Sequence, residues 1–135
     1  MAPCALICHD RGHIEAALAA AATHDRPVLL LTPEGAAGYG GPGYFQALFA
    51  NALARQPVAH ARCALDCGDD AAMALFALEA GWRALILRGS AKVRARVAAA
   101  AGTLGAELLA PPRQAVDLGL AADPAAAIEQ ALAPG

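Results

Sequence analysis

Short apolar runs alternate with helical patterns along this chain. Five runs that carry few charges predict β-strands, at residues 4–8, 28–32, 63–66, 84–87 and 106–109. Continuous apolar runs of this length are typical of parallel strands that are covered on both faces. The segment VDLGL, residues 116–120, leaves open a sixth short strand.

Between these runs, apolar residues recur with the period of an α-helix. The stripes expected to face the core are Ile14, Ala17, Leu18 and Ala21; Phe45, Leu48, Phe49 and Ala52; Met73, Phe76, Ala77 and Ala80; Val93, Val97, Ala100 and Leu104; and Ala125, Ile128 and Leu132. Helix starts are indicated by Asp10, by Ser90 and by Asp123 with Pro124 after it, because these residues cap or open a first turn.

Alternation of strands and helices predicts an α/β fold with a parallel sheet of five strands, or of six. The length allows one sizeable core, so a single domain over residues 1–135 is expected. Two architectures remain open. One is a TIM-like half-barrel whose open inner face pairs with another subunit of a homo-oligomer. The other is a flavodoxin-like open sheet, in which the first and third strands are neighbours.

Composition excludes several classes of partner. Ten basic and twelve acidic residues give a net charge of −2, and aromatic residues make up 4%, so nucleic acid and anionic membrane are not expected as partners. No apolar run approaches the ~18 residues of a membrane span. The start, MAPCALICHD, has no basic region before its apolar residues, which predicts a strand rather than a signal peptide. A cytoplasmic protein is expected.

Two long links interrupt the pattern. The glycine-rich segment EGAAGYGGPGY, residues 34–44, is interpreted as a flexible connection or as a lid over the strand ends. It lacks the lysine and the serine or threonine of a phosphate-binding loop. The second link covers residues 110–123 and contains VDLGL.

Residues with chemical potential follow the predicted strands, where ligands bind in parallel α/β folds. A metal or redox site of Cys8, His9, Asp66 and Cys67 is one interpretation, because zinc takes sulfur, nitrogen and oxygen ligands. The alternative is structural: Asp10 caps a helix, Asp66 accepts backbone hydrogen bonds in its turn, and the cysteines pack as small hydrophobic residues.

Arg88, Gly89 and Ser90 form a second candidate site. An arginine beside the free N–H groups of a helix start can hold a phosphate or carboxylate, so these residues, with His9 and Asp10, are candidates for binding a small anionic metabolite. A salt-bridged surface arginine is the alternative interpretation.

The segment RCALDCGDDAAMALFALEAGWRALILRGS, residues 62–90, resembles the class II fructose- and tagatose-bisphosphate aldolases. Leu65-Asp66, Ala80-Gly81-Trp82 and Gly89-Ser90 align with Leu-Asp, Ala-Gly-Phe and Gly-Ser of that family. The opening strand and helix and the GAELL segment at 105–109 extend the resemblance. It covers about the N-terminal half of the family's barrel.

The resemblance implies a barrel-type architecture, with Asp66 in the place of the family's proton-transferring aspartate. The family holds zinc through three histidines, the first of which follows that aspartate; here the position is Cys67. The other two histidines and the phosphate loops belong to the second half of the barrel, so the metal site is expected to be lost. We therefore expect a binding protein for a small anionic metabolite or an oligomer subunit. The alternative is a metal- or thiol-dependent lyase or hydrolase in which Asp66 and Cys67 are catalytic.

Overall fold

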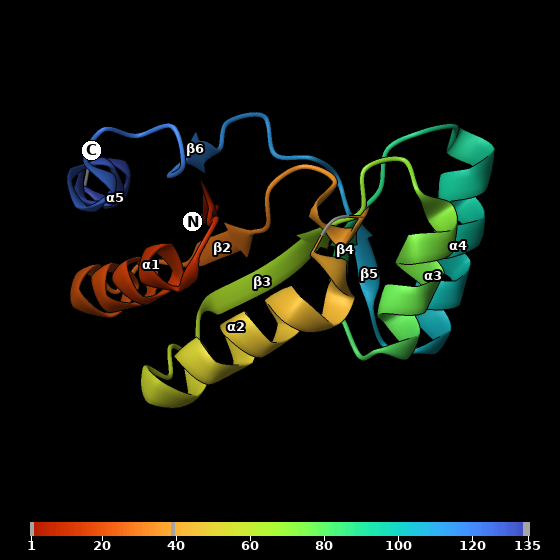
Figure 1. Cartoon of the computed structure of the whole chain (residues 1–135), viewed down its shortest axis with the longest axis horizontal. Helices are drawn as coiled ribbons and strands as arrows, with labels where there is room; N and C mark the ends of the chain where they lie inside the picture. Colours follow the sequence, from red (N-terminus) through yellow and green to blue (C-terminus); the bar gives the residue numbers. More distant parts are fainter. Residues whose placement is uncertain (1, 39, 134–135) are drawn as a thin grey trace. The chain divides into compact units, whose positions relative to one another are not determined.

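The computed structural model describes residues 2–38 and 40–133. Its elements, most of which are labelled in Figure 1, are in chain order β1 (Cys4–Ile7), α1 (Arg11–His24), β2 (Val28–Leu31), the short 3₁₀ helix η1 (Ala36–Gly38), α2 (Gly41–Arg55), β3 (Ala61–Asp66), α3 (Ala71–Glu79), β4 (Ala84–Ile86), α4 (Ala91–Thr103), β5 (Glu107–Leu109), β6 (Val116–Asp117) and α5 (Pro124–Leu132). The predicted alternation of strands and helices is confirmed.

The described strands form one parallel sheet in the order β5-β4-β3-β2-β1-β6. The sixth strand that the sequence left open is present, and it pairs with β1 through Leu6 and Val116 and through Ile7 and Asp117. Strands β1 to β5 follow one another in sequence order, as in a half-barrel. The flavodoxin-like alternative is wrong, because β2 lies between β1 and β3.

The chain divides into two compact units. The first contains Met1–Leu31, Ala47–Cys63 and Pro112–Gly135, and the second contains Thr32–Gln46 and Ala64–Pro111. Strand β3 passes from the first unit into the second. The single domain expected over residues 1–135 stays a prediction beside this division.

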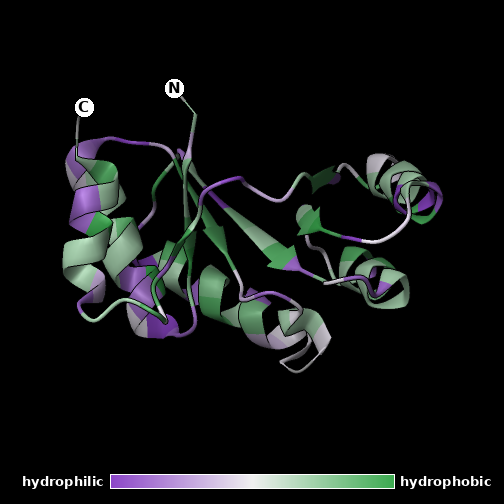
Figure 2. Cartoon of the chain, turned by 90° about the horizontal axis from the view of Figure 1, so that it is seen from above, coloured by the Kyte–Doolittle hydropathy of each residue, from purple (hydrophilic) through white to green (hydrophobic). Residues whose placement is uncertain are grey.

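The core of the first unit is formed by strands β1 and β2 with helices α1 and α5. Cys4 pairs with Val28 and Ile7 with Leu31 across the two strands. The fully buried side chains include Leu6, Ile14, Leu18, Val28, Leu30, Ile128 and Leu132. The predicted helix starts are confirmed, since Asp10 accepts a hydrogen bond from His13 N–H and Asp123 from Ala126 N–H. Figure 2 shows hydrophobic residues (green) concentrated in the strands.

The core of the second unit is centred on β4, all three residues of which are buried. Trp82 is 5% exposed and its indole N–H donates to the carbonyl of Pro42 at 3.0 Å. This bond anchors the first turn of α2, which begins at Gly41. Part of the glycine-rich segment at 34–44 is therefore helical, where the sequence predicted a link.

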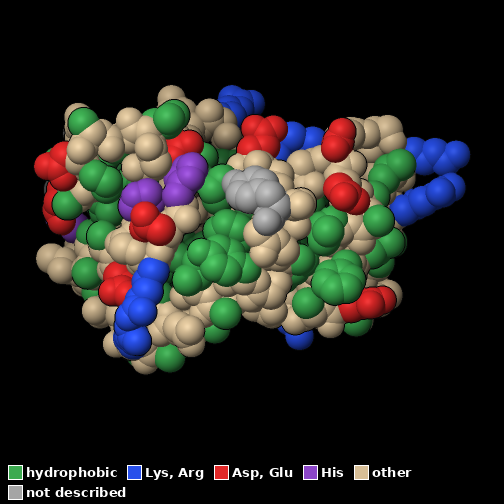
Figure 3. Space-filling model, in the orientation of Figure 1, with side chains coloured by type: hydrophobic (Ala, Val, Ile, Leu, Met, Phe, Trp, Pro, Cys, Tyr) green, Lys and Arg blue, Asp and Glu red, His purple; other side chains and the backbone are tan. Residues whose placement is uncertain are grey.

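Three of the predicted core-facing stripes are wrong in part, since Ala125 of the last stripe is exposed as well. Phe76 is 60% exposed, and Val93 and Leu104 are 38% and 47% exposed. Ala77 and Val97 of these stripes are buried as predicted, and Ala74 and Leu78 of α3 and Ala101 of α4 are buried as well. Hydrophobic side chains (green) therefore reach the surface (Figure 3). No helix formed by the described residues is long and apolar enough to span a bilayer.

Candidate functional site

The carboxylate of Asp66, at the end of β3, accepts hydrogen bonds from three directions. Its side chain is 6% exposed. Its Oδ1 atom accepts from the backbone N–H groups of Gly35 at 3.1 Å and Gly68 at 2.9 Å. Nη1 of Arg88 lies 2.8 Å from both carboxylate oxygens. Burial of this charge is thus balanced by one cation and two backbone donors.

Local sequence explains how the donors reach Asp66. Gly35 and Gly68 have φ angles of +70° and +60°, a region that glycine enters without strain. A Cβ on Gly68 would lie 3.5 Å from Cα of Gly35, so these two loops approach each other closely. The backbone N–H of Arg88 donates to the carbonyl of Gly68 at 2.7 Å, which sets the arginine beside the turn. The expectation that Asp66 accepts backbone bonds in its turn is confirmed.

Arg88 is a salt-bridged arginine, as the alternative interpretation had it. Besides Asp66, its Nε atom lies 3.7 Å from Oε1 of Glu34. The hydrogen bond to Asp66 raises the pKa of Arg88 above its usual value. Ser90 caps α4, since its Oγ accepts from Val93 N–H at 3.3 Å. Anion binding by Arg88, Gly89 and Ser90 stays a prediction, and two carboxylates already balance the arginine's charge.

The thiols at the strand ends are buried. Burial raises the pKa of Cys67 to about 12, and the neighbouring carboxylates of Asp66 and Asp70 act in the same direction. Burial also raises the pKa of Cys8, with Cys63, Asp10 and Asp117 adding to it. Both side chains are therefore thiols at neutral pH, and the thiolate is the form that attacks substrates and binds metals. A catalytic role for Asp66 and Cys67 stays a prediction.

The residues within each unit do not fit a zinc ion. Among the described residues, no three histidine, cysteine, aspartate or glutamate side chains converge as metal ligands. The sulfur of Cys67, which stands where the aldolase resemblance places a histidine, donates weakly to the carbonyl of Leu65 at 3.9 Å. Cys8 and His9 belong to the first unit and Asp66 and Cys67 to the second, so their joint metal site stays a prediction.

A second polar cluster lies at the carboxyl end of β1 in the first unit. His9 Nε2 is 2.6 Å from Oδ1 of Asp117, at the end of β6. The backbone N–H of His9 donates to Nδ1 of His13 at 3.0 Å, and the two rings meet edge to face. Asp10 caps α1 and Gly119 N–H donates to Asp117 at 2.9 Å. This cluster ties β6 to β1.

Hydrogen bonding fixes the tautomers of the two histidines. Because the carboxylate of Asp117 can only accept, Nε2 of His9 carries the proton of this hydrogen bond. Because Nδ1 of His13 accepts from a backbone N–H, its Nε2 carries the proton. The sequence indicated His9 as a candidate but missed His13 and Asp117, since the pairing of β6 with β1 was not evident.

A third feature, which the sequence analysis missed, is a cavity of about 340 Å³ beside the amino ends of β1 and β6. It is lined by Ala2, Pro3, Cys4, Ala5, Arg26, Gln114, Ala115, Val116 and Ala131. Nη1 of Arg26 donates to the carbonyls of Leu132 and Ala133 at the end of α5, at 3.2 and 3.4 Å. Nε of Arg26 is buried, and no described residue accepts its hydrogen bond.

Comparison with known proteins identifies the fold of this chain. No family model matches the chain, and no curated protein does. Among solved structures, the chain is similar to a "putative fructose-1,6-biphosphate aldolase" from Coccidioides immitis, with a TM-score of 0.67 and 18% identity. The fold is aldolase-like. The match covers 81% of this chain and 45% of that one, so the chain spans less than half of the length of the solved protein.

Replacing Arg88 is expected to destabilise the second unit. Arg88→Met leaves the buried Asp66 carboxylate without its cation, and we expect the free energy of unfolding to fall by about 3 kcal/mol, as for other broken buried pairs. Arg83→Met, at an exposed arginine of the same unit, is the control and should change stability by less than about 0.5 kcal/mol. Urea unfolding measures both. Equal stability of the two variants would show that Asp66 does not depend on Arg88.

A side chain at position 119 is expected to displace His9. A Cβ on Gly119 would lie 2.5 Å from Nε2 of His9, so Gly119→Ala should break the contact between His9 and Asp117. Gly102→Ala, where a Cβ meets nothing within 4 Å, is the control. The Nε2–H signal of His9 in NMR spectra should be protected from exchange in wild type and in the control. Retained protection in Gly119→Ala would contradict the geometry.

The buried thiols predict a loss of stability at alkaline pH. The folded protein keeps a proton on Cys67 up to a pKa of about 12, above the ordinary cysteine value of 9.0, whereas the unfolded chain releases it above pH 9. The stabilisation is complete below about pH 9 and falls by about 1.4 kcal/mol per pH unit above it. Cys67→Ala should show a shallower decline between about pH 9 and 11. Parallel curves for the two proteins would refute this linkage.

Proposed function

We propose that this chain binds a small carboxylate-bearing metabolite in the cavity beside Arg26. The observation that carries the proposal is the buried Nε–H of Arg26, which has no acceptor among the described residues although it belongs to a residue that lines the cavity. A buried donor without an acceptor costs about 1–3 kcal/mol. An oxygen atom of a bound ligand would remove that cost.

The shape of the guanidinium group selects the class of ligand. Nη1 is engaged by the last carbonyls of α5, which leaves the edge formed by Nε and Nη2. Two parallel N–H groups on one edge of arginine match the two oxygens of a carboxylate. A phosphate oxygen pair offers the same chemistry. The site is expected to hold one such group, with the Arg26 charge as its counter-ion.

The rest of the lining favours a ligand with a short apolar body. The cavity wall consists mainly of alanine, proline and valine side chains, with Gln114 as a polar neighbour and no acidic side chain among its described residues. Burial raises the pKa of the Cys4 thiol although Arg26 opposes the shift. The thiol therefore stays neutral and does not compete with an anion for the arginine.

A lyase or hydrolase that uses Asp66 and Cys67 is the alternative function. It requires a thiolate or a proton-accepting carboxylate at the end of β3. Burial of Cys67 and the hydrogen bonds of Asp66 both oppose this requirement. Binding of an anion in the cavity beside Arg26 requires neither a thiolate nor a proton-accepting carboxylate, and we therefore favour the binding function.

Calorimetric titration of the intact chain tests this function. Acetate, succinate and inorganic phosphate serve as probes. We expect saturable binding of at least one of them, weakened about 10- to 100-fold in Arg26→Lys, because the ammonium keeps the charge but loses the paired N–H edge. The matched control is Arg113→Lys, at an exposed arginine that does not line the cavity.

Two outcomes would overturn the proposal. Heats that do not saturate, or that are the same in wild type and in Arg26→Lys, would mean that the arginine holds no anion. Equal weakening in Arg26→Lys and Arg113→Lys would indicate a general effect of charge instead of a site.

A further inference from the structure

Strand β5 lies at the edge of the sheet formed by the described residues. Glu107 N–H donates to the carbonyl of Arg83, beside β4, at 3.0 Å. Because successive residues of a strand direct their backbone groups to opposite sides, Leu109 also faces β4, and the N–H and C=O of Leu108 face the open edge. The edge ends soon after, since Pro111 and Pro112 follow Ala110.

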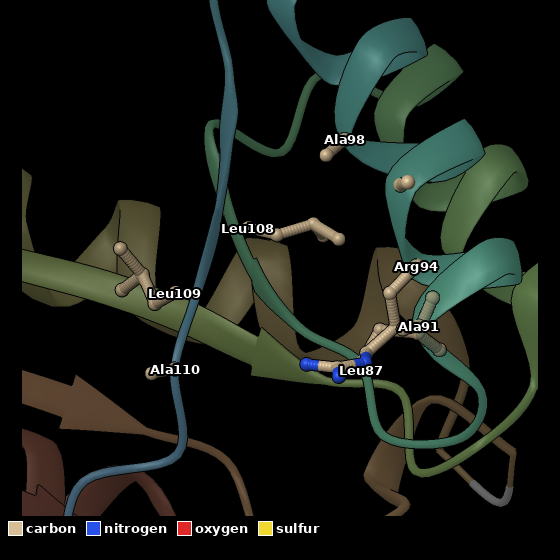
Figure 4. Close-up of a pocket in the computed structure, with 8 residues that line it drawn as sticks. Leu87, Ala91, Arg94, Ala98, Leu108, Leu109 and Ala110 are labelled. Atoms are coloured by element: carbon tan, nitrogen blue, oxygen red, sulfur yellow. The ribbon is translucent and has the colours of Figure 1, made fainter.

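A groove of about 320 Å³ runs between this strand and α4. Figure 4 shows Leu108 pointing toward α4 and Leu109 pointing to the other side of the strand. The helix side of the groove is lined by Ala91, Arg94, Ala95 and Ala98, all of which are exposed. Exposed helix faces ordinarily carry long polar side chains. Here the row of alanines leaves room for another helix at a short interaxial distance.

We infer that a second copy of this chain covers this face through a two-fold axis beside Leu108. The antiparallel partner of β5 is then β5 of the second copy, and Leu108 forms a hydrogen-bonded pair with its own counterpart. A symmetric pair of this kind satisfies the outward N–H and C=O of both residues with two hydrogen bonds. The two Leu108 side chains fill the space between the two α4 helices.

Charge complementarity supports a second copy as the occupant. The same axis makes the two α4 helices antiparallel, and it brings Arg94, which lies one turn from the start of α4, opposite the last turn of the partner helix. The carboxyl end of a helix carries partial negative charge and attracts cations. Helix α4 has no acidic residue to hold its own Arg94. The match occurs twice, once in each copy.

The arrangement is closed. A two-fold interface uses the same surface of both copies. Both β5 strands are then paired with each other, and no third copy can bind to either edge. This distinguishes it from the pairing of open inner sheet faces expected from the sequence, because it places the contact at the β5 edge and at the outer side of α4.

Sedimentation velocity of the intact chain from micromolar to millimolar concentration tests the inference. We expect a monomer–dimer equilibrium whose dissociation constant rises about 30-fold or more in Ala98→Glu, which puts a charge into the groove. Ala99→Glu is the matched control, since Ala99 is exposed on the same helix but does not line the groove. A monomer at every concentration would overturn the inference, as would a dimer that Ala98→Glu leaves unchanged or that both variants weaken equally.

Cross-linking tests the register. In a Cys4→Ser/Cys63→Ser background, Leu108→Cys should give a disulfide-linked dimer under mild oxidation, because Cα atoms of a hydrogen-bonded pair lie about 5.5 Å apart, within the usual span of a disulfide. Leu104→Cys, at an exposed position near the end of α4, should not cross-link at a comparable rate. The reverse preference would show that the copies meet elsewhere. Loss of anion binding in Arg26→Lys leaves both measurements unaffected, so the two proposals can fail separately.

Discussion

The turn at the end of β3 depends on the buried carboxylate of Asp66. Three chain segments meet it: the loop at Gly35, the loop at Gly68, and Arg88 beyond β4. A carboxylate that is 6% exposed is stable only while such donors surround it. The hydrogen bonds of Asp66 therefore fix the positions of all three donors. At the ends of β3 and β4, these charged and polar contacts stabilise the structure in place of apolar packing.

Alanine determines how the helices of the second unit cover the sheet. Helices α3 and α4 bury mainly small side chains, Ala74, Ala77 and Ala101, together with Leu78 and Val97. Small side chains allow a helix to approach its neighbours closely. Larger side chains of the same stripes, Phe76 for example, turn outward. Small side chains also line the outer side of α4, where a row of alanines beside β5 forms the apolar wall of the groove.

The strands and helices could be predicted from the sequence because the features that define them depend on residues close to one another in the chain. Strand runs, the caps at Asp10 and Ser90 and the Leu65-Asp66 turn are all readable from spacing and residue type. The contact of His9 with Asp117 spans 108 positions in sequence, and it follows from the pairing of β6 with β1, which no local pattern encodes. The exposure of Phe76 was not predicted for a related reason. Periodicity identifies the apolar face of a helix, but it does not show which residues of that face are buried in the core.

The two proposed binding sites rest on an unmet donor and an open strand edge, and not on the residue types that suggest chemistry. Asp66, Arg88 and His9 are reactive types at strand ends, yet each is satisfied by a neighbour within its own unit. The sequence analysis gave Arg26 no role and Leu108 only a place in a strand. The buried Nε–H of Arg26 has no acceptor among the described residues, and Leu108 belongs to a strand at the edge of the sheet. Folded proteins rarely leave such groups unpaired when they are buried. We therefore propose the unmet donor at Arg26 and the open edge at Leu108, in preference to the polar clusters, as the places where a partner binds.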